Sequence, residues 1–83
     1  MVSPLLDLNA VNRTGDAELQ ALIDACQALS GPQLEEVRRD EDLWRAATIS
    51  PSCGAEMAEN MAVAKDTLRA FLKRFNHLPK RRA

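Results

Sequence analysis

Hydrophobic positions recur at helical spacing along most of this chain. Between residues 16 and 30 the large apolar side chains follow the i, i+3, i+4, i+7 pattern of an amphipathic helix, at Leu19, Leu22, Ile23, Cys26 and Leu29. Asp16 stands at the start of this run, where an acidic side chain suits the positive end of a helix dipole. The Gly31-Pro32 pair ends it. The pattern predicts a helix over residues 16–30.

The longest pattern runs from about residue 52 to residue 76. Its apolar side chains are spaced 4, 3, 4, 3, 4 and 3 residues apart, at Met57, Met61, Ala64, Leu68, Phe71, Phe75 and Leu78. This is the heptad spacing of packed helices. Charged side chains occupy the opposite face, at Glu59, Asp66, Lys73 and Lys80. We predict one long C-terminal helix that stops near Asn76, since asparagine tolerates the left-handed conformation of a helix end.

The segment from residue 32 to residue 49 is less regular. Leu34, Val37 and Trp44 can share a helical face, but residues 38–42 contain no apolar side chain. The helix therefore either crosses solvent there or breaks into two short pieces. We expect one helix, because neither glycine nor proline interrupts it. We expect Trp44 to fill the core of a thin bundle; the alternative is an anchor at an interface.

The N-terminal segment carries the last apolar cluster. Ser3-Pro4 is a candidate helix start, and a short helix or turn follows it as far as Val11. No segment shows the alternation of a β-strand. The predicted fold class is all-α, a small bundle of three principal helices plus this N-terminal element. Residues 1–79 form a single helical domain, and residues 80–83 form a basic tail.

Composition narrows the class of protein. The chain has 83 residues, 46% of them apolar and 28% charged, which allows one small domain. No apolar run approaches the ~18 residues of a membrane span, so no membrane contact is expected. The N-terminus lacks the basic region of a secretory signal, so we expect a cytoplasmic location. Reduced cysteines follow: Cys26 as a small core residue, and Cys53 as an exposed thiol in a turn.

Catalytic chemistry finds little support in the sequence. His77 is the single histidine, and the two cysteines do not show the spacing of a zinc site. No glycine-rich phosphate loop occurs. Acid pairs such as Glu35 and Glu36 lack a predicted pocket in which to act as acid or base. We therefore predict no enzyme, and no catalytic, cofactor-binding or metal-ligating residue.

Charge is strongly segregated along the chain. Residues 1–42 hold nine acids and three bases, a net of −6, whereas residues 43–83 hold three acids and eight bases, a net of +5. We expect the two halves to face each other inside one bundle. The alternative is a pair of oppositely charged surfaces that bind partners or pair two copies.

The predicted function follows from this profile. We expect a small non-enzymatic protein-interaction module that binds and modulates, for example inhibits, a larger protein. Its composition gives the impression of a bacterial or bacteriophage accessory protein. The candidate partner-binding residues are Leu5, Leu6, Leu8, Trp44, Arg69, Lys73 and Arg74. The alternative for the three leucines is that they cap the open end of the bundle.

Two further interactions are considered. A nucleic-acid-associated regulator could use the basic C-terminal region on phosphates, although the isoelectric point near 5.7 argues against a dedicated DNA-binding domain. A homodimer would bury surplus apolar surface on the long helix, along a seam of Met57, Met61, Val63, Leu68 and Leu72. The competing account is a monomer whose N-terminal leucines fold back over that stripe.

Overall fold

The computed structural model describes residues 5–50 and 54–77, and this part of the chain is helical without any strand. A short 3₁₀ helix comes first, η1 (Leu8–Val11), and four α-helices follow it: α1 (Ala17–Gln27), α2 (Gly31–Val37), α3 (Glu41–Thr48) and α4 (Gly54–Arg74). The all-α prediction is confirmed. The predictions on Ser3-Pro4, Cys53, Leu78 and the 80–83 tail lie outside the described residues.

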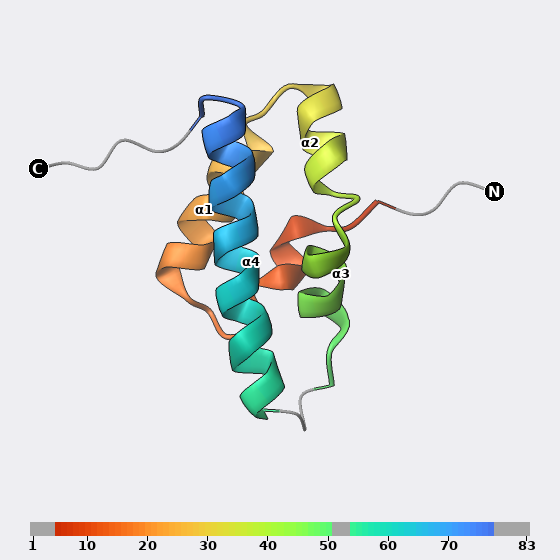
Figure 1. Ribbon diagram of the computed structural model, residues 1–83, viewed down its shortest axis with the longest axis vertical. Helices are drawn as coiled ribbons and strands as arrows, with labels where there is room; N and C mark the ends of the chain where they lie inside the picture. The colour runs from red at the N-terminus through yellow and green to blue at the C-terminus, as the bar shows by residue number, and fades with distance from the viewer. Residues whose placement is uncertain (1–4, 51–53, 78–83) are drawn as a thin grey trace, which may run out of the picture.

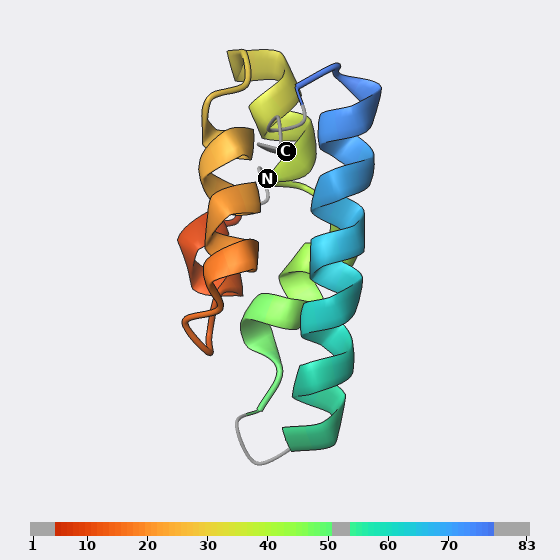
Figure 2. The same ribbon diagram turned by 90° about the vertical axis from the view of Figure 1, so that its left-hand side faces the viewer.

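Helix α4 is the longest element and the centre of the packing. It runs almost the full height of the molecule, with α1 along one side and α2 and α3 following one another down the other (Figure 1). Turned by 90°, α1 and α4 form opposite edges (Figure 2). The tightest packing joins α4 to α3 and to α1, and η1 packs against α3 and α1. The core therefore lies between α1, α3 and α4, and η1 packs beside it at about mid-height (Figures 1 and 2).

Helix α1 matches its prediction closely. Asp16 caps it, and its Oδ1 accepts a hydrogen bond from the Leu19 backbone N–H at 3.0 Å. Gly15 precedes the cap with φ +72°, a conformation that glycine adopts without steric cost. All five predicted apolar positions are buried, at Leu19, Leu22, Ile23, Cys26 and Leu29.

The prediction of one helix over residues 32–49 is wrong. The chain forms α2 and α3, separated by a turn at residues 38–40. A continuous helix would need the Asp42 N–H to donate to the Arg38 carbonyl. Instead that N–H donates to Asp40 Oδ1 at 2.9 Å, and the Arg38 carbonyl accepts from the Leu6 N–H at 3.0 Å. Asp40 thus competes successfully for the helical backbone, as short polar side chains do.

The break also resolves a packing conflict. Val37 and Leu43 are both fully buried, yet six residues of continuous helix would turn them about 120° apart. Two short helices let each side chain reach the core.

Trp44 does not fill the core, so that expectation is wrong. Its exposed fraction is 38%, whereas Leu43 and Ala46 on the same helix are fully buried. Adjacent residues point about 100° apart around a helix. Since Leu43 points inward, Trp44 is directed to the side.

The end of α4 confirms the predicted stop. Asn76 has φ +55°, the left-handed conformation. The His77 N–H donates to the Leu72 carbonyl at 2.7 Å, and the Asn76 N–H donates to the Lys73 carbonyl at 3.1 Å. This pair of bonds is the Schellman arrangement, and it satisfies carbonyls that the helix leaves open.

Burial along α4 follows the predicted heptad pattern only from Met61 to Leu68; beyond it Leu72, which is not part of that pattern, is buried in place of Phe71. The innermost side chains are Met61, Ala64, Leu68 and Leu72. Met57, Phe71 and Phe75 are only half-buried. The innermost positions are thus 3, 4 and 4 residues apart, the spacing of a helix that presents one broad face to a globular core.

The N-terminal segment folds back over the core. Leu6, Leu8 and Val11 are buried. Two hydrogen bonds fix the segment to the end of α2: the Leu6 N–H donates to the Arg38 carbonyl, and Arg38 Nε donates to the Leu6 carbonyl at 2.7 Å. Leu6 and Leu8 therefore belong to the hydrophobic core of the bundle.

Candidate functional site

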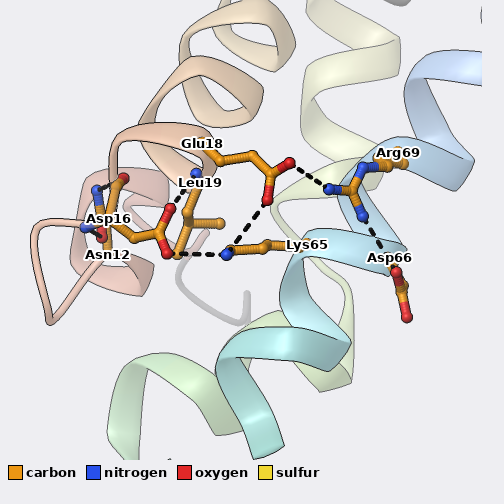
Figure 3. Close-up of polar contacts among 7 residues, drawn as sticks. All are labelled: Asn12, Asp16, Glu18, Leu19, Lys65, Asp66 and Arg69. Atoms are coloured by element: carbon orange, nitrogen blue, oxygen red, sulfur yellow. Dashed lines mark hydrogen bonds and ion pairs between the residues drawn. The ribbon is translucent and has the colours of Figure 1, made fainter. Parts of the chain in front are cut away.

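The densest polar cluster joins the start of α1 to the middle of α4 (Figure 3). Lys65 Nζ lies 2.8 Å from Asp16 Oδ2 and 3.3 Å from Glu18 Oε1. Arg69 lies 2.8 Å from Glu18 Oε2 and 3.2 Å from Asp66 Oδ1. Lys65 and Arg69 are four residues apart and share one flank of α4, so both reach the first turn of α1. We call these five residues the α1–α4 charge cluster.

The pKa values in this cluster follow from the pairing. The hydrogen bond from Lys65 holds the pKa of Asp16 below its ordinary value of 3.8, with help from the Leu19 N–H. Lys65 and then Arg69 lower the pKa of Glu18 below 4.5. In return, Asp16 raises the pKa of Lys65 above 10.5. All three groups are therefore charged near pH 7, and none is suited to exchange a proton there.

A second charge contact lies at the other end of α4. Arg74 forms an ion pair with Glu36 of α2. Its guanidinium also lies over the rings of Phe71 and Phe75, 5.1 and 4.8 Å from their centroids. The two rings stack with centroids 6.0 Å apart. This cation–π cluster covers the half-buried edge of the core.

These contacts show whether the acidic half of the chain, residues 1–42, faces the basic half, residues 43–83. Asp16, Glu18 and Glu36 belong to the acidic half, and their partners Lys65, Arg69 and Arg74 belong to the basic half. The interpretation that the halves face each other inside one bundle is confirmed for these pairs. Because these side chains pair within the chain, fewer unpaired charges are left to bind another molecule.

A groove runs beside the α1–α4 charge cluster. Its volume is about 400 Å³, and α4 contributes Ala58, Met61 and Ala62 to its wall besides the charged residues. Thr14 is the one hydroxyl-bearing residue on its rim. The charged groups around it are paired with one another, so the groove presents no free acid, base or nucleophile.

The arrangement of the side chains also bears on metal binding and on thiol reactivity. Within the described ranges, no group of three or more histidine, cysteine or acidic side chains is arranged to hold a metal ion. Cys26 is free and buried as predicted, and burial raises the pKa of its thiol to about 11. Its sulfur is thus a protonated core group near pH 7.

The predicted partner-binding residues separate into two groups. Leu6 and Leu8 are buried, and Leu5 is half-buried. Arg69 and Arg74 are held in ion pairs within the chain. Four of the seven keep exposed side-chain surface: Trp44, Lys73, Arg69 with 41% of its side chain exposed, and Arg74 with 57%. Of the three bases, Lys73 has no ion-pair partner in the described part of the chain. A surface built from all seven residues does not exist.

The outward face of α3 carries the exposed Trp44 and is the candidate binding surface that we consider next to the charged contacts. Its exposed positions are Glu41, Trp44, Arg45 and Thr48, which lie on one side of the helix by their i, i+3, i+4, i+7 spacing. The cap at Asp40 and the bond from Thr48 Oγ1 to the Trp44 carbonyl at 2.9 Å support both ends. We call these four residues the Trp44 surface.

The predicted dimer seam is mostly inside the chain. Leu68 and Leu72 are fully buried and Met61 is 6% exposed. Val63 is 42% exposed and points away from the core, and Met57 is half-buried. A second copy can therefore reach only Val63 and the edge of Met57.

Sequence reasoning missed several positions. It gave no pairing role to Asp16, Glu18 or Lys65, although the segregated charge was a signal that such pairs form. It also treated Arg38 only as part of a polar run, whereas Arg38 fixes the N-terminal segment. Nothing in the local pattern marks that role, because its partner is a backbone carbonyl distant in sequence.

Comparisons of the chain with protein-family models, with curated proteins and with solved structures find no match. Among the described residues, no helix is both long and apolar enough to span a bilayer. The functional inference therefore rests on the side chains themselves.

Proposed function

We propose that this protein is a small non-enzymatic interaction module that binds and modulates, for example inhibits, a larger protein through the Trp44 surface. The observation that supports this proposal is the 38% exposure of the single tryptophan on a capped helix. Tryptophan is enriched among residues that dominate binding energy at interfaces. An exposed tryptophan on a rigid element loses little conformational freedom on binding, which favours affinity.

The composition around Trp44 agrees with this proposal. Glu41, Arg45 and Thr48 give a polar rim of mixed charge around one large ring. A hydrophobic centre with a polar rim is the usual anatomy of a protein interface. A cytoplasmic bacterial or phage accessory protein remains the setting in which we place this module.

The alternative, a nucleic-acid-associated regulator, has less support. Three of the described bases on α4 are engaged with acids, at Lys65, Arg69 and Arg74. Lys73 remains for phosphate contacts, together with the tail bases that lie outside the described residues. Binding to phosphates gains from each free base, so the paired bases reduce the expected affinity.

A capture experiment tests the proposal. The tagged protein is used on lysate of its source cell beside Trp44→Ala and a matched control, Val63→Ala, which removes the other large apolar side chain exposed in the described part of the chain. We expect one protein partner that the wild type and V63A retain and W44A loses. Equal capture by W44A overturns the proposed surface. Retention on a DNA or heparin column at ~100–150 mM salt would instead support the nucleic-acid alternative.

A homodimer is the second part of the proposal. The exposed Val63 supports it, whereas the charge halves no longer do, since they pair within one chain. Light scattering at micromolar concentration decides between a mass near 9.2 kDa, which overturns the dimer, and twice that mass. In a dimer, Val63→Glu should restore the monomer, because burying an unpaired carboxylate is unfavourable.

A further inference from the structure

A cavity separate from the Trp44 surface lies between the N-terminal segment, the end of α1 and helix α2. Its volume is about 350 Å³, and it is lined by Asp7, Leu8, Gln27, Leu34 and Arg38. This volume is at the lower end of the range for ligand sites. A single amino-acid residue fits within this volume.

Arg38 is positioned in this cavity by bonds that leave part of its guanidinium free. Its Nε donates to the Leu6 carbonyl at 2.7 Å, and its own carbonyl accepts from the Leu6 N–H at 3.0 Å. No other residue in the described ranges bonds to the guanidinium, so both terminal nitrogens can donate to a ligand. Two N–H groups in one plane match the geometry of a carboxylate.

Asp7 supplies the complementary group. One of its oxygens, Oδ1, accepts from the Asn9 N–H at 3.1 Å as the cap of η1. Its second oxygen has no partner within the described part of the chain, and Asp7 and Arg38 form no ion pair with each other. The cavity therefore contains a hydrogen-bond acceptor and a cation that do not neutralise one another.

The remaining lining residues define the rest of the ligand. Leu8 is 2% exposed and Leu34 is half-buried, so together they give an apolar wall. Gln27 adds an exposed amide. A suitable ligand combines a carboxylate, an N–H donor and an apolar side chain. The carboxylate of Asp7 disfavours a phosphate, which carries more negative charge.

We propose that this cavity binds the C-terminal residue of a partner polypeptide, with its free carboxylate on Arg38, its amide N–H on Asp7 and an apolar side chain against Leu8 and Leu34. Capture of a terminal carboxylate is a known mode of peptide recognition. This inference rests on the proposed function, because it supplies a second contact to a protein partner. The cavity is distinct from the Trp44 surface, so the two proposals fail independently.

Amide chemical shifts measured by NMR during peptide titration test the inference. The probes are the tripeptide acetyl-Ala-Ala-Leu with a free carboxylate, the same tripeptide as its C-terminal amide, and free leucine. We expect shifts at Asp7, Leu8, Gln27, Leu34 and Arg38 with the acid peptide, and binding of the amide weaker by about tenfold, since it lacks the charge that Arg38 receives. Equal binding of acid and amide, or no shifts at these residues at several millimolar peptide, overturns the proposal. Tighter binding of free leucine overturns the assignment to a polypeptide.

Variants separate the two polar contacts. Asp7→Asn keeps an oxygen that caps η1 and replaces the second, unpartnered oxygen by an NH2 group, which cannot accept the amide N–H of the ligand. The acid peptide should therefore bind several-fold more weakly to it. Arg38→Gln should lose about tenfold, and Glu59→Gln, a surface carboxylate on α4, is the matched control with unchanged binding. If R38Q does not fold, the comparison of the acid and amide peptides on the wild type and on D7N still tests the proposed site. Unchanged binding by D7N overturns the role given to Asp7, and Trp44→Ala should leave peptide binding intact.

Discussion

The contact between α1 and α4 and the turn between α2 and α3 use charged residues in opposite ways. Across α1 and α4, charges from distant parts of the chain meet, as in the pairs of Lys65 with Asp16 and Glu18. Around the α2–α3 turn the charges act locally: Arg39 pairs with Glu35, and Asp40 caps α3. Segregated charge therefore joins two helices, whereas mixed charge in one short run ends one helix and begins the next.

The two regions also differ in what they bury. α1 contributes four buried side chains along one face, and α4 contributes four more. α2 buries Val37 alone, and α3 buries Leu43 and Ala46. The first region thus holds most of the core, while the second leaves Trp44 exposed for another molecule. Six changes, in sequence or in pH, test this division, taken from the largest expected effect to the smallest.

Leu68→Ala should damage the first region most. Leu68 is fully buried at the centre of the α4 face, and removing a buried leucine side chain costs about 3–4 kcal/mol. Such a loss rivals the ~5 kcal/mol stability of a small domain. Urea unfolding followed by circular dichroism measures it. Val63→Ala is the control and should change the free energy of unfolding by less than ~0.5 kcal/mol; equal effects would show that Leu68 is not a core residue.

Phe71→Ala should be less damaging than Leu68→Ala. Full burial would predict a loss of about 3–5 kcal/mol, but the ring is half-buried beneath Arg74. We expect a loss of about 1–3 kcal/mol in the same assay, since less apolar area leaves water. An unchanged melting temperature would show an exposed ring and would make Phe71 a candidate binding residue.

Asp40→Ala tests the second region. It removes the acceptor for the Asp42 and Leu43 N–H groups, and loss of an N-cap costs about 1 kcal/mol. Asp40→Asn retains an acceptor and should be close to wild type. The measurement is again urea unfolding. If alanine raises both helicity and stability, the turn at 38–40 depends on Asp40 alone and a continuous helix is accessible.

Acid should weaken the contact of α1 with α4. Asp16 and Glu18 have lower pKa values in the folded chain than their ordinary 3.8 and 4.5. The contribution of these two carboxylates to folding stability is complete above their ordinary pKa values. It is lost as the pH falls through their lower pKa values in the folded chain. Melting temperature should thus decline below about pH 4.5, less steeply in Asp16→Asn/Glu18→Gln. If the melting temperature of the double variant falls with acid as steeply as that of the wild type, the α1–α4 charge cluster is not the cause of the decline.

Alkaline pH acts on the same cluster through Lys65. Asp16 raises the pKa of Lys65 above its ordinary value of 10.5. The contribution of Lys65 to folding stability is therefore fully present below pH 10.5 and is lost as the pH rises through its pKa in the folded chain. Lys65→Met should flatten this alkaline decline, which the same melting experiment reports.

Deleting residues 80–83 should have the smallest effect. Three of the four residues are basic, and Pro79 precedes them, so we expect no contribution to the core. Helicity and melting temperature should be those of the full chain. A truncated chain that stays folded but loses its partner would assign the tail a role in binding.

Much of the fold was predictable from local patterns. The apolar positions of α1 and the stop at Asn76 follow from spacing and residue type, because each depends on neighbours within a few positions. The fate of Leu6 and Leu8 was left between two alternatives, and the structure places both in the core. The break after Val37 was weighed and not chosen, because neither glycine nor proline interrupts that segment. The backbone bond from Leu6 to the Arg38 carbonyl, which accompanies the Asp40 cap at the break, joins residues too far apart in sequence to be predicted from local pattern. Of the predicted partner surface, Leu6 and Leu8 are buried and Leu5 is half-buried, whereas Trp44, Lys73, Arg69 and Arg74 keep exposed side-chain surface.

The sequence by itself determined which segments become helical, where α1 begins, and that the two halves of the chain carry opposite charge. These properties depend on periodicity and on the chemistry of single residues. Tertiary structure alone decided that Lys65 and Arg69 meet Asp16 and Glu18, that Leu43 rather than Trp44 enters the core, and that Arg38 shares a cavity with Asp7. The physical reason is that burial and pairing depend on which helix faces are brought together, and a helix face offers several possible neighbours until the whole chain has packed.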